Sequence, residues 1–199
     1  MIEKKRDVAR EICRSYNVTL SPEAMEKFAN MLVPRKLLRG AHALAEGDIC
    51  NYMYYVERGL VLQYYHKNNL AVAEYIAHEG DMVICIESFF KREPSRIAIS
   101  MLEPGILYGI PHDELFEWAS TSYEVCQLIF AIEQRSLIIS QQKADVIRFE
   151  SAKERYLRTL RENPDIVRRA PLHYVASYLQ MTPETLSRVR ASTTEDDLY

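Results

Sequence analysis

Three regions of the chain differ in how their hydrophobic and polar residues alternate. In the first region, up to about residue 35, apolar residues such as Met25, Phe28 and Leu32 recur every three or four positions. This spacing predicts a helix with one apolar face. Ser21 followed by Pro22 suits the start of that helix, because a serine hydroxyl can accept a hydrogen bond from a free backbone N–H and proline has no N–H to satisfy.

The second region, from residue 37 to 110, contains all six glycines and short runs rich in β-branched and aromatic residues. Such runs, separated by polar turns like Asn68-Asn69 and Gly80-Asp81, predict strands. Several short strands at this spacing indicate an antiparallel sandwich or barrel. The expected strands lie at residues 53–56, 60–65, 71–76 and 97–101.

The third region begins near residue 113, where glycine disappears and a helical pattern returns. Apolar residues spaced by seven positions run from Val125 to Val146 and indicate a coiled-coil seam. A long helix with one narrow apolar seam favours pairing with a second copy of the chain, and packing on the chain's own β-domain is the alternative. The predicted homodimer interface consists of Val125, Leu128, Ile129, Ile132, Arg135, Ile139 and Val146.

The segment from residue 171 to 190 predicts two short helices joined by a tight turn. Pro171 can open the first helix, and Ala176 is small enough to let the two helices approach each other. Thr182 can cap the second helix, with Pro183 in its first position. Two such helices, the second of which carries arginines, match a helix-turn-helix. An ordinary helical hairpin is the alternative.

The second helix of this pair carries side chains suited to DNA. An α-helix fits the major groove, and its first turn presents N–H donors to phosphates. Glu184 can accept from a cytosine amino group, and Arg188, one turn later, can donate to guanine O6 and N7. The predicted DNA-binding residues are Thr182, Pro183, Glu184, Thr185, Ser187, Arg188 and Arg190.

Several motifs resemble those of Crp/Fnr-family transcription regulators. Residues 176–179 and 182–188 resemble the family's helix-turn-helix, especially that of a branch common in Bacteroidetes. The resemblance implies an α+β fold, in which a double-stranded β-helix or jelly roll of the cyclic-nucleotide-binding type precedes a long dimerisation helix and the helix-turn-helix. The implied domains are 1–118, 119–149 and 150–199. Looser resemblances lie at 54–61, 87–90, 94–95 followed by 97–99, and 154–157.

The residues that hold an effector in this family differ here. Members that bind cyclic AMP hold its phosphate with a Gly-Glu pair and an Arg-Ser pair, whereas the best-matching positions here are Cys85-Ile86 and Pro94-Ser95. A cyclic phosphate needs a guanidinium or several amide donors. Arg96 comes one position late, which in a strand turns it to the opposite face. We therefore expect a small-molecule effector other than cyclic AMP, with candidate contacts at Glu87, Ser88, Ser95 and Arg96.

The turn of the helix-turn-helix also departs from the family pattern. Gln180 stands where the family usually has a glycine. Glycine adopts a positive φ freely, whereas glutamine there costs about 1 kcal/mol. The turn therefore remains possible at a modest cost.

Charge is unevenly distributed along the chain, whose 199 residues carry a formal net charge of −3. Residues 151–192 hold eight arginines and lysines against four carboxylates, a net charge of +4. The tail from residue 193 carries Glu195, Asp196 and Asp197. A basic C-terminal segment on a mildly acidic body suggests binding to a polyanion.

The sequence lacks the motifs of enzymes, metal sites and membrane proteins. The four cysteines, which lie at least 35 positions apart, form neither a C-x-x-C pair nor the N-terminal cluster of Fnr-type oxygen sensors. We therefore expect buried free thiols, no metal or cofactor, and no catalysis. The pattern predicts a cytoplasmic DNA-binding regulator, with RNA polymerase as a possible further partner. The alternative is a ligand-binding or protein-interaction module that does not bind DNA.

Overall fold

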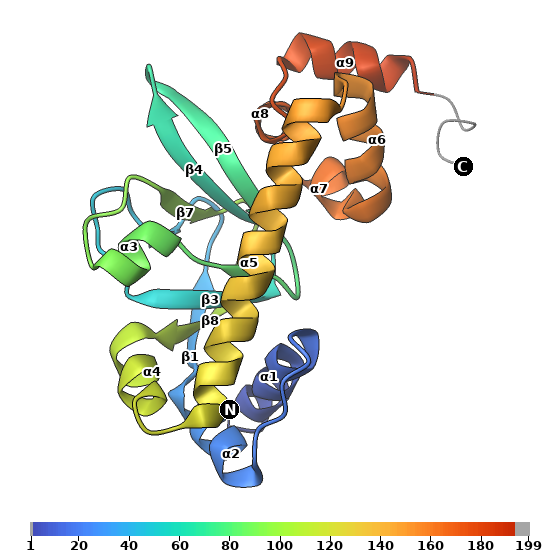
Figure 1. Cartoon of the computed structure of the whole chain (residues 1–199). Coiled ribbons are helices and arrows are strands. Elements are labelled where there is room, and N and C mark those ends of the chain that lie inside the picture. Colours follow the sequence, from blue (N-terminus) through green and yellow to red (C-terminus); the bar gives the residue numbers. More distant parts are fainter. Residues whose placement is uncertain (1, 194–199) are drawn as a thin grey trace.

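The computed structural model describes residues 2–193 (Figure 1). The acidic tail residues Glu195, Asp196 and Asp197 lie outside the described residues. The helices are α1 (Ile2–Ser15), α2 (Pro22–Met31), α3 (Ile86–Lys91), α4 (His112–Ala119), α5 (Tyr123–Phe149), α6 (Ala152–Glu162), α7 (Pro164–Arg169), α8 (Leu172–Tyr178) and α9 (Pro183–Ala191). The strands are β1 (Val33–Leu37), β2 (His42–Leu44), β3 (Tyr52–Arg58), β4 (Val61–Lys67), β5 (Leu70–Ala77), β6 (Met82–Val83), β7 (Ala98–Met101) and β8 (Gly105–Pro111).

The strands form a roll of two four-stranded sheets, ordered β1-β8-β3-β6 and β2-β7-β4-β5, with antiparallel pairing. The strands β3, β4, β5 and β7 confirm the four predicted runs. The sequence pattern does not predict β1, which contains Pro34. Proline is tolerated because β1 lies at a sheet edge, where one side of its backbone needs no ladder hydrogen bond.

One corner of the roll depends on a close approach of two chain segments. Gly105 begins β8 directly against the end of β3. A Cβ atom at Gly105 would overlap the carbonyl oxygen of Arg58. Only glycine therefore lets β8 pair with β3 at this point.

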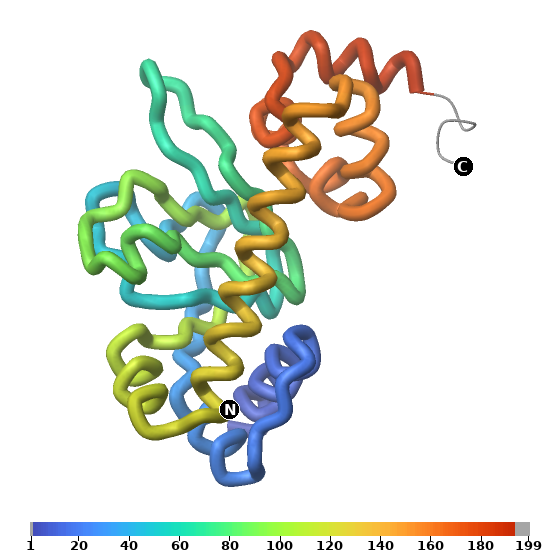
Figure 2. Tube along the Cα trace, in the orientation of Figure 1, coloured from blue at the N-terminus to red at the C-terminus, as the bar shows by residue number. Residues whose placement is uncertain are grey.

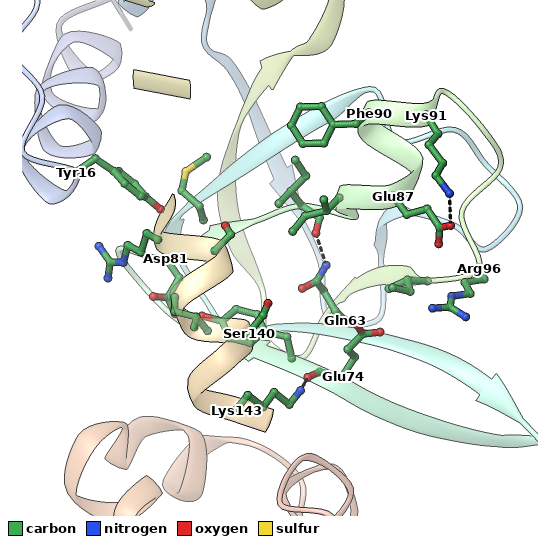
Figure 3. Close-up of a pocket in the computed structure, with 18 residues that line it drawn as sticks. Tyr16, Gln63, Glu74, Asp81, Glu87, Phe90, Lys91, Arg96, Ser140 and Lys143 are labelled. Carbon is green, nitrogen blue, oxygen red and sulfur yellow. Dashed lines mark hydrogen bonds and ion pairs between the residues drawn. The ribbon is translucent and has the colours of Figure 1, made fainter. Parts of the chain in front are cut away.

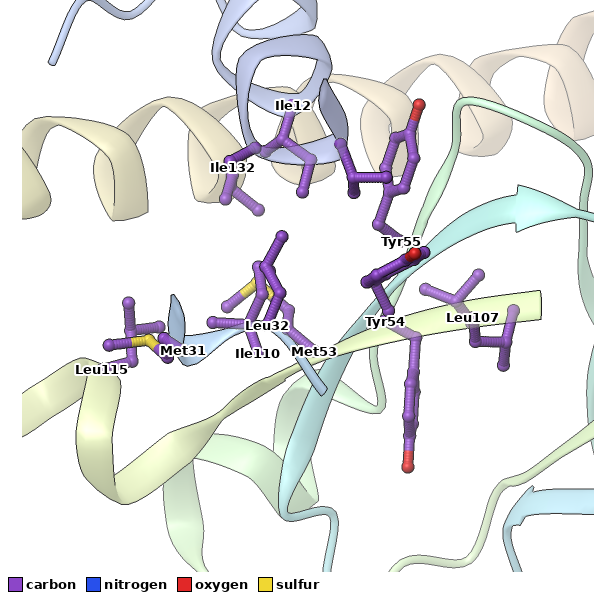
Figure 4. Close-up of a cluster of buried hydrophobic side chains, with 14 of the residues drawn as sticks. Ile12, Met31, Leu32, Met53, Tyr54, Tyr55, Leu107, Ile110, Leu115 and Ile132 are labelled. Atoms are coloured by element: carbon purple, nitrogen blue, oxygen red, sulfur yellow. The ribbon is translucent and has the colours of Figure 1, made fainter. Parts of the chain in front are cut away.

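The main apolar core joins strands of both sheets to the surrounding helices. The helices α1, α2 and the N-terminal half of α5 each contribute buried side chains to it. Figure 4 shows Ile12 of α1 and Ile132 of α5 on one side of Leu32, Met53 and Ile110. The long helix is thus anchored to its own roll over its first half.

This anchoring corrects the predicted dimer interface at four of its seven residues. Val125, Leu128, Ile129 and Ile132 are between 0% and 8% exposed within the core of a single chain, so they are not available to a second copy. Arg135 is also occupied within the chain, since its Nη1 donates to the carbonyl of Ser15 at 3.2 Å. Ile139 and Val146 line cavities on this same side of α5. A seven-residue spacing shows that one helix face is apolar, but it does not say which partner covers that face.

The helices α6 to α9 form a C-terminal unit at the end of α5 (Figure 2), and this unit has a small core of its own. Its first helix begins with a reciprocal cap, in which Ser151 and Glu154 each bond the other's backbone N–H. Tyr156, Val175 and Leu186 meet in this core.

Of the cysteines, Cys126 alone is exposed, which contradicts the expectation that all four thiols are buried.

Within residues 2–193, no helix is long and apolar enough to cross a bilayer. The same residues contain no group of three histidine, cysteine or acidic side chains placed to hold a metal ion.

Candidate nucleic-acid interface and ligand cavity

The helices α8 and α9 form the predicted helix-turn-helix. The turn between them uses Gln180 in the left-handed conformation, with a φ of 52°. This is the strained turn expected from the sequence, now occupied by glutamine in place of glycine. The N–H of Met181 donates to the carbonyl of Ala176 at 3.0 Å, which closes the end of α8.

An arginine outside the motif stabilises this turn. Arg155 of α6 donates from Nε to the carbonyl of Leu179 at 2.8 Å and from Nη2 to the carbonyl of Gln180 at 3.3 Å. Its Nη1 donates to the carbonyl of Glu150 at 2.6 Å. Carbonyls at a helix end lack partners inside the helix, so Arg155 satisfies groups that the strained turn would otherwise expose. This role cannot be predicted from sequence spacing, because Arg155 lies about 25 positions before the turn.

The second helix is held by its cap and by one buried leucine. Thr182 accepts a hydrogen bond from the N–H of Thr185 at 3.2 Å, which confirms the predicted N-cap. Leu186 is fully buried against Val175 and Ala176. These contacts fix which face of α9 points away from the protein.

The outer face of α9 presents most of the predicted DNA-binding residues. Of these, only Thr185 is half-buried, because it packs beside the cap. The Nε of Arg188 donates to the backbone carbonyl oxygen of Glu184 at 3.4 Å. The two residues are four positions apart, so their side chains leave the same face of α9. The pKa of the Glu184 carboxyl is lowered by backbone hydrogen bonding and by Thr182, so the group is an ionised acceptor at neutral pH. The exposed members are Thr182, Pro183, Glu184, Ser187, Arg188 and Arg190.

A cavity of about 630 Å³ lies between the roll and α5 (Figure 3). The helix α3 contributes Ile86 and Phe90, and α5 contributes Ser140 and Lys143. Lys143 donates to the backbone carbonyl of Glu74, and burial lowers the pKa of its ammonium. The cavity wall thus combines apolar side chains with many charged and polar ones, which can fix the orientation of a small molecule.

Carboxylates and cations alternate around this cavity. Glu74, Asp81 and Glu87 line it, and burial raises the pKa of the Asp81 carboxyl. Lys91 pairs with Glu87 at 2.9 Å, and Arg135 is bonded to the backbone of α1. Most of the positive charge at the wall therefore already has a partner.

The chain matches no protein-family model, and no curated protein matches it. Its structure is similar to that of FixK2 from Bradyrhizobium japonicum, with a TM-score of 0.69 and 16% identity over 80% of this chain and 83% of that chain. The c-di-GMP responsive global regulator CLP of Xanthomonas campestris gives a TM-score of 0.65 and 17% identity over 86% and 90% of the two chains. The Catabolite Activator Protein of Thermus thermophilus gives 0.56 and 18% over 92% and 87%.

The chain has the Crp/Fnr fold. The order of roll, long helix and helix-turn-helix confirms the predicted α+β architecture. The candidate effector contacts lie in two places in this fold. Glu87 and Ser88 belong to α3, and Ser95 and Arg96 belong to the loop before β7.

The Crp/Fnr fold separates the four candidate effector contacts into two pairs. Glu87 and Arg96 line the cavity. Ser88 and Ser95 are buried, and their hydroxyls donate to the carbonyls of Glu93 at 2.5 Å and Ile97 at 2.7 Å. The two serines therefore serve the local backbone and do not face the cavity.

Arg96 is the one candidate contact for which strand alternation predicted the opposite face. That alternation does not apply, because β7 begins only at Ala98. Arg96 therefore lies in the preceding bend, where the two-residue period of a strand does not apply. Its guanidinium lies at the cavity wall (Figure 3).

Proposed function

We propose that this chain is a DNA-binding transcription regulator of the Crp/Fnr family. The observation that supports this most directly is the capped helix α9, whose exposed face carries Glu184, Ser187 and Arg188. Hydroxyl, carboxylate and guanidinium groups on one helix can read base edges in a major groove. The basic character of the surrounding unit adds attraction to phosphates.

A second copy of the chain is proposed to pair along the exposed face of α5. This face is distinct from the buried residues that pack on the roll, and its residues alternate by four and three positions, as in a coiled-coil seam. Phe130 and Leu137 are 64% and 63% exposed on it, which is costly for large apolar groups in water. We call Cys126, Phe130, Glu133, Leu137 and Ala144 the outer seam; Ser140 and Ile147 continue its spacing but also line the cavities.

A dimer formed through the outer seam would present two copies of α9. Two such helices can enter successive major grooves about 34 Å apart on a near-palindromic site. This geometry matches the proposed regulator and predicts two half-sites related by a two-fold axis.

Selection of bound sequences from random duplex DNA should enrich a near-palindrome. Affinity for the enriched duplex should fall steeply as salt rises, because arginines release counterions from phosphates. Absence of DNA binding at low salt would contradict the proposal and favour a ligand-binding or protein-interaction module.

We further propose that the cavity between the roll and α5 binds a small effector other than cyclic AMP. Three carboxylates at the wall, Glu74, Asp81 and Glu87, oppose a phosphate, and the hydroxyl of Ser95 is already bonded to the backbone. Calorimetric titration with cyclic AMP should give no binding heat, in a preparation that binds the enriched duplex. Micromolar binding would overturn this assignment.

A further inference from the structure

The C-terminal unit, α6 to α9, which we call the DNA-reading unit from here on, is docked on the roll of its own chain. The strand β5 runs beside α8 (Figure 1). A second apolar cluster crosses this interface, where Leu62 and Ile76 of the roll meet Ile166 of α7. Tyr174 and Tyr178 of α8 pack on the same cluster. The helix α9 takes no part in this cluster and keeps its outer face exposed.

A charged clamp lies at the edge of this interface. Arg169, at the end of α7, donates from Nη1 and Nη2 to the two carboxylate oxygens of Glu79 at 2.7 and 2.9 Å. Its Nη2 also donates to Glu103 at 2.6 Å. The pKa of the Glu79 carboxyl is lowered to about 2 by its hydrogen bonds with Arg169. A guanidinium that donates to two carboxylates fixes their orientation as well as their distance, because its N–H donors lie in one plane.

Both carboxylates of the clamp belong to loops of the roll. Glu79 follows β5 and also accepts from the N–H of Gly59 at 2.7 Å, and Glu103 lies between β7 and β8. Next to Glu79, His78 shares a hydrogen bond with Asn163 at 3.2 Å. Two segments that are 66 and 90 positions from Arg169 in sequence are thus tied to one side chain.

The strand β5 contacts both the cavity and the DNA-reading unit. Glu74 and Tyr75 line the cavity. The N–H of the preceding residue, Ala73, donates to the hydroxyl of Ser177 in α8 at 2.9 Å. The docked orientation of α8 is therefore set by the same strand that bounds the cavity.

We propose that Arg169 is a positioning residue, which holds the DNA-reading unit in one orientation on the roll and so presets the direction of α9. This inference rests on the proposed function, because orientation matters only if α9 reads DNA. The clamp leaves α9 uncovered, so it orients the reading helix and does not block it. Two half-sites can be read together only when both copies of α9 point correctly.

The test compares Arg169→Gln with Arg168→Gln in the full chain. Arg168 is the preceding residue of the same helix and is exposed, so this control removes the same charge without the clamp. Hydrogen exchange should become at least tenfold faster over residues 70–77 and 172–178 in Arg169→Gln, and remain unchanged in Arg168→Gln. Exchange over α1 should stay the same in both variants, which shows that the fold is intact.

The second measurement compares the enriched duplex with a duplex carrying one half-site. Arg169→Gln should lose about five- to tenfold in the ratio of two-site to half-site affinity, whereas half-site affinity should match that of Arg168→Gln. A double variant, Glu79→Gln with Glu103→Gln, should reproduce both effects. Unchanged exchange, or an unchanged or raised affinity ratio, would overturn the inference. If the unaltered protein binds no DNA, the proposed function fails, and the exchange measurement still decides whether the clamp holds the unit.

Discussion

Leu137→Asp should convert the proposed dimer into monomers. Leu137 is 63% exposed in a single chain and lies in the middle of the outer seam. Its replacement therefore costs the monomer little. In the dimer, two carboxylates would enter an apolar interface without partners, which costs about 3–5 kcal/mol for a buried uncompensated charge. Dissociation should thus increase more than 100-fold. Light scattering coupled to size exclusion measures the change directly.

Two control variants distinguish the outer seam from the inner face of α5. Gln127→Asp changes an exposed residue beside the seam and should leave the dimer intact. Ile132→Asp alters a residue that is 3% exposed in the chain's own core, so it should unfold the protein and lower its melting temperature. A folded monomer from Ile132→Asp, or a stable dimer from Leu137→Asp, would show that the seam is wrongly placed.

Arg188→Ala should weaken DNA binding by about 1–3 kcal/mol and relax the preference at one base position. Arg188 is exposed on α9, so the substitution leaves the core of the C-terminal unit unchanged. An arginine that bonds guanine O6 and N7 discriminates between bases, whereas one that contacts phosphate lowers affinity for every sequence equally. Repeating the selection with the variant therefore separates the two roles.

Arg39→Ala provides the charge-matched control, because Arg39 is an exposed residue between β1 and β2, in the roll. It should keep the full preference of the unaltered protein at every position. If Arg188→Ala also kept that preference, the assignment of Arg188 to base reading would be incorrect.

The elements that depend on short-range patterns could be predicted from the sequence. The four strand runs, the Thr182 cap and the strained turn at Gln180 all follow from neighbouring residues. The serine pair at positions 88 and 95 could not be assigned in this way. Whether a hydroxyl faces a cavity or bonds a backbone carbonyl depends on loop geometry, and the strand alternation used for Arg96 does not extend into a loop.

The sequence by itself determined that α5 is a long helix with an apolar face and that α8 and α9 form a helix-turn-helix. Only the tertiary structure decided that Val125 and Ile132 face the chain's own roll, which leaves Phe130 and Leu137 exposed. It alone also brought Arg169 to Glu79 and Glu103. Local spacing governs which face of an element is apolar, but packing between distant segments decides what that face meets.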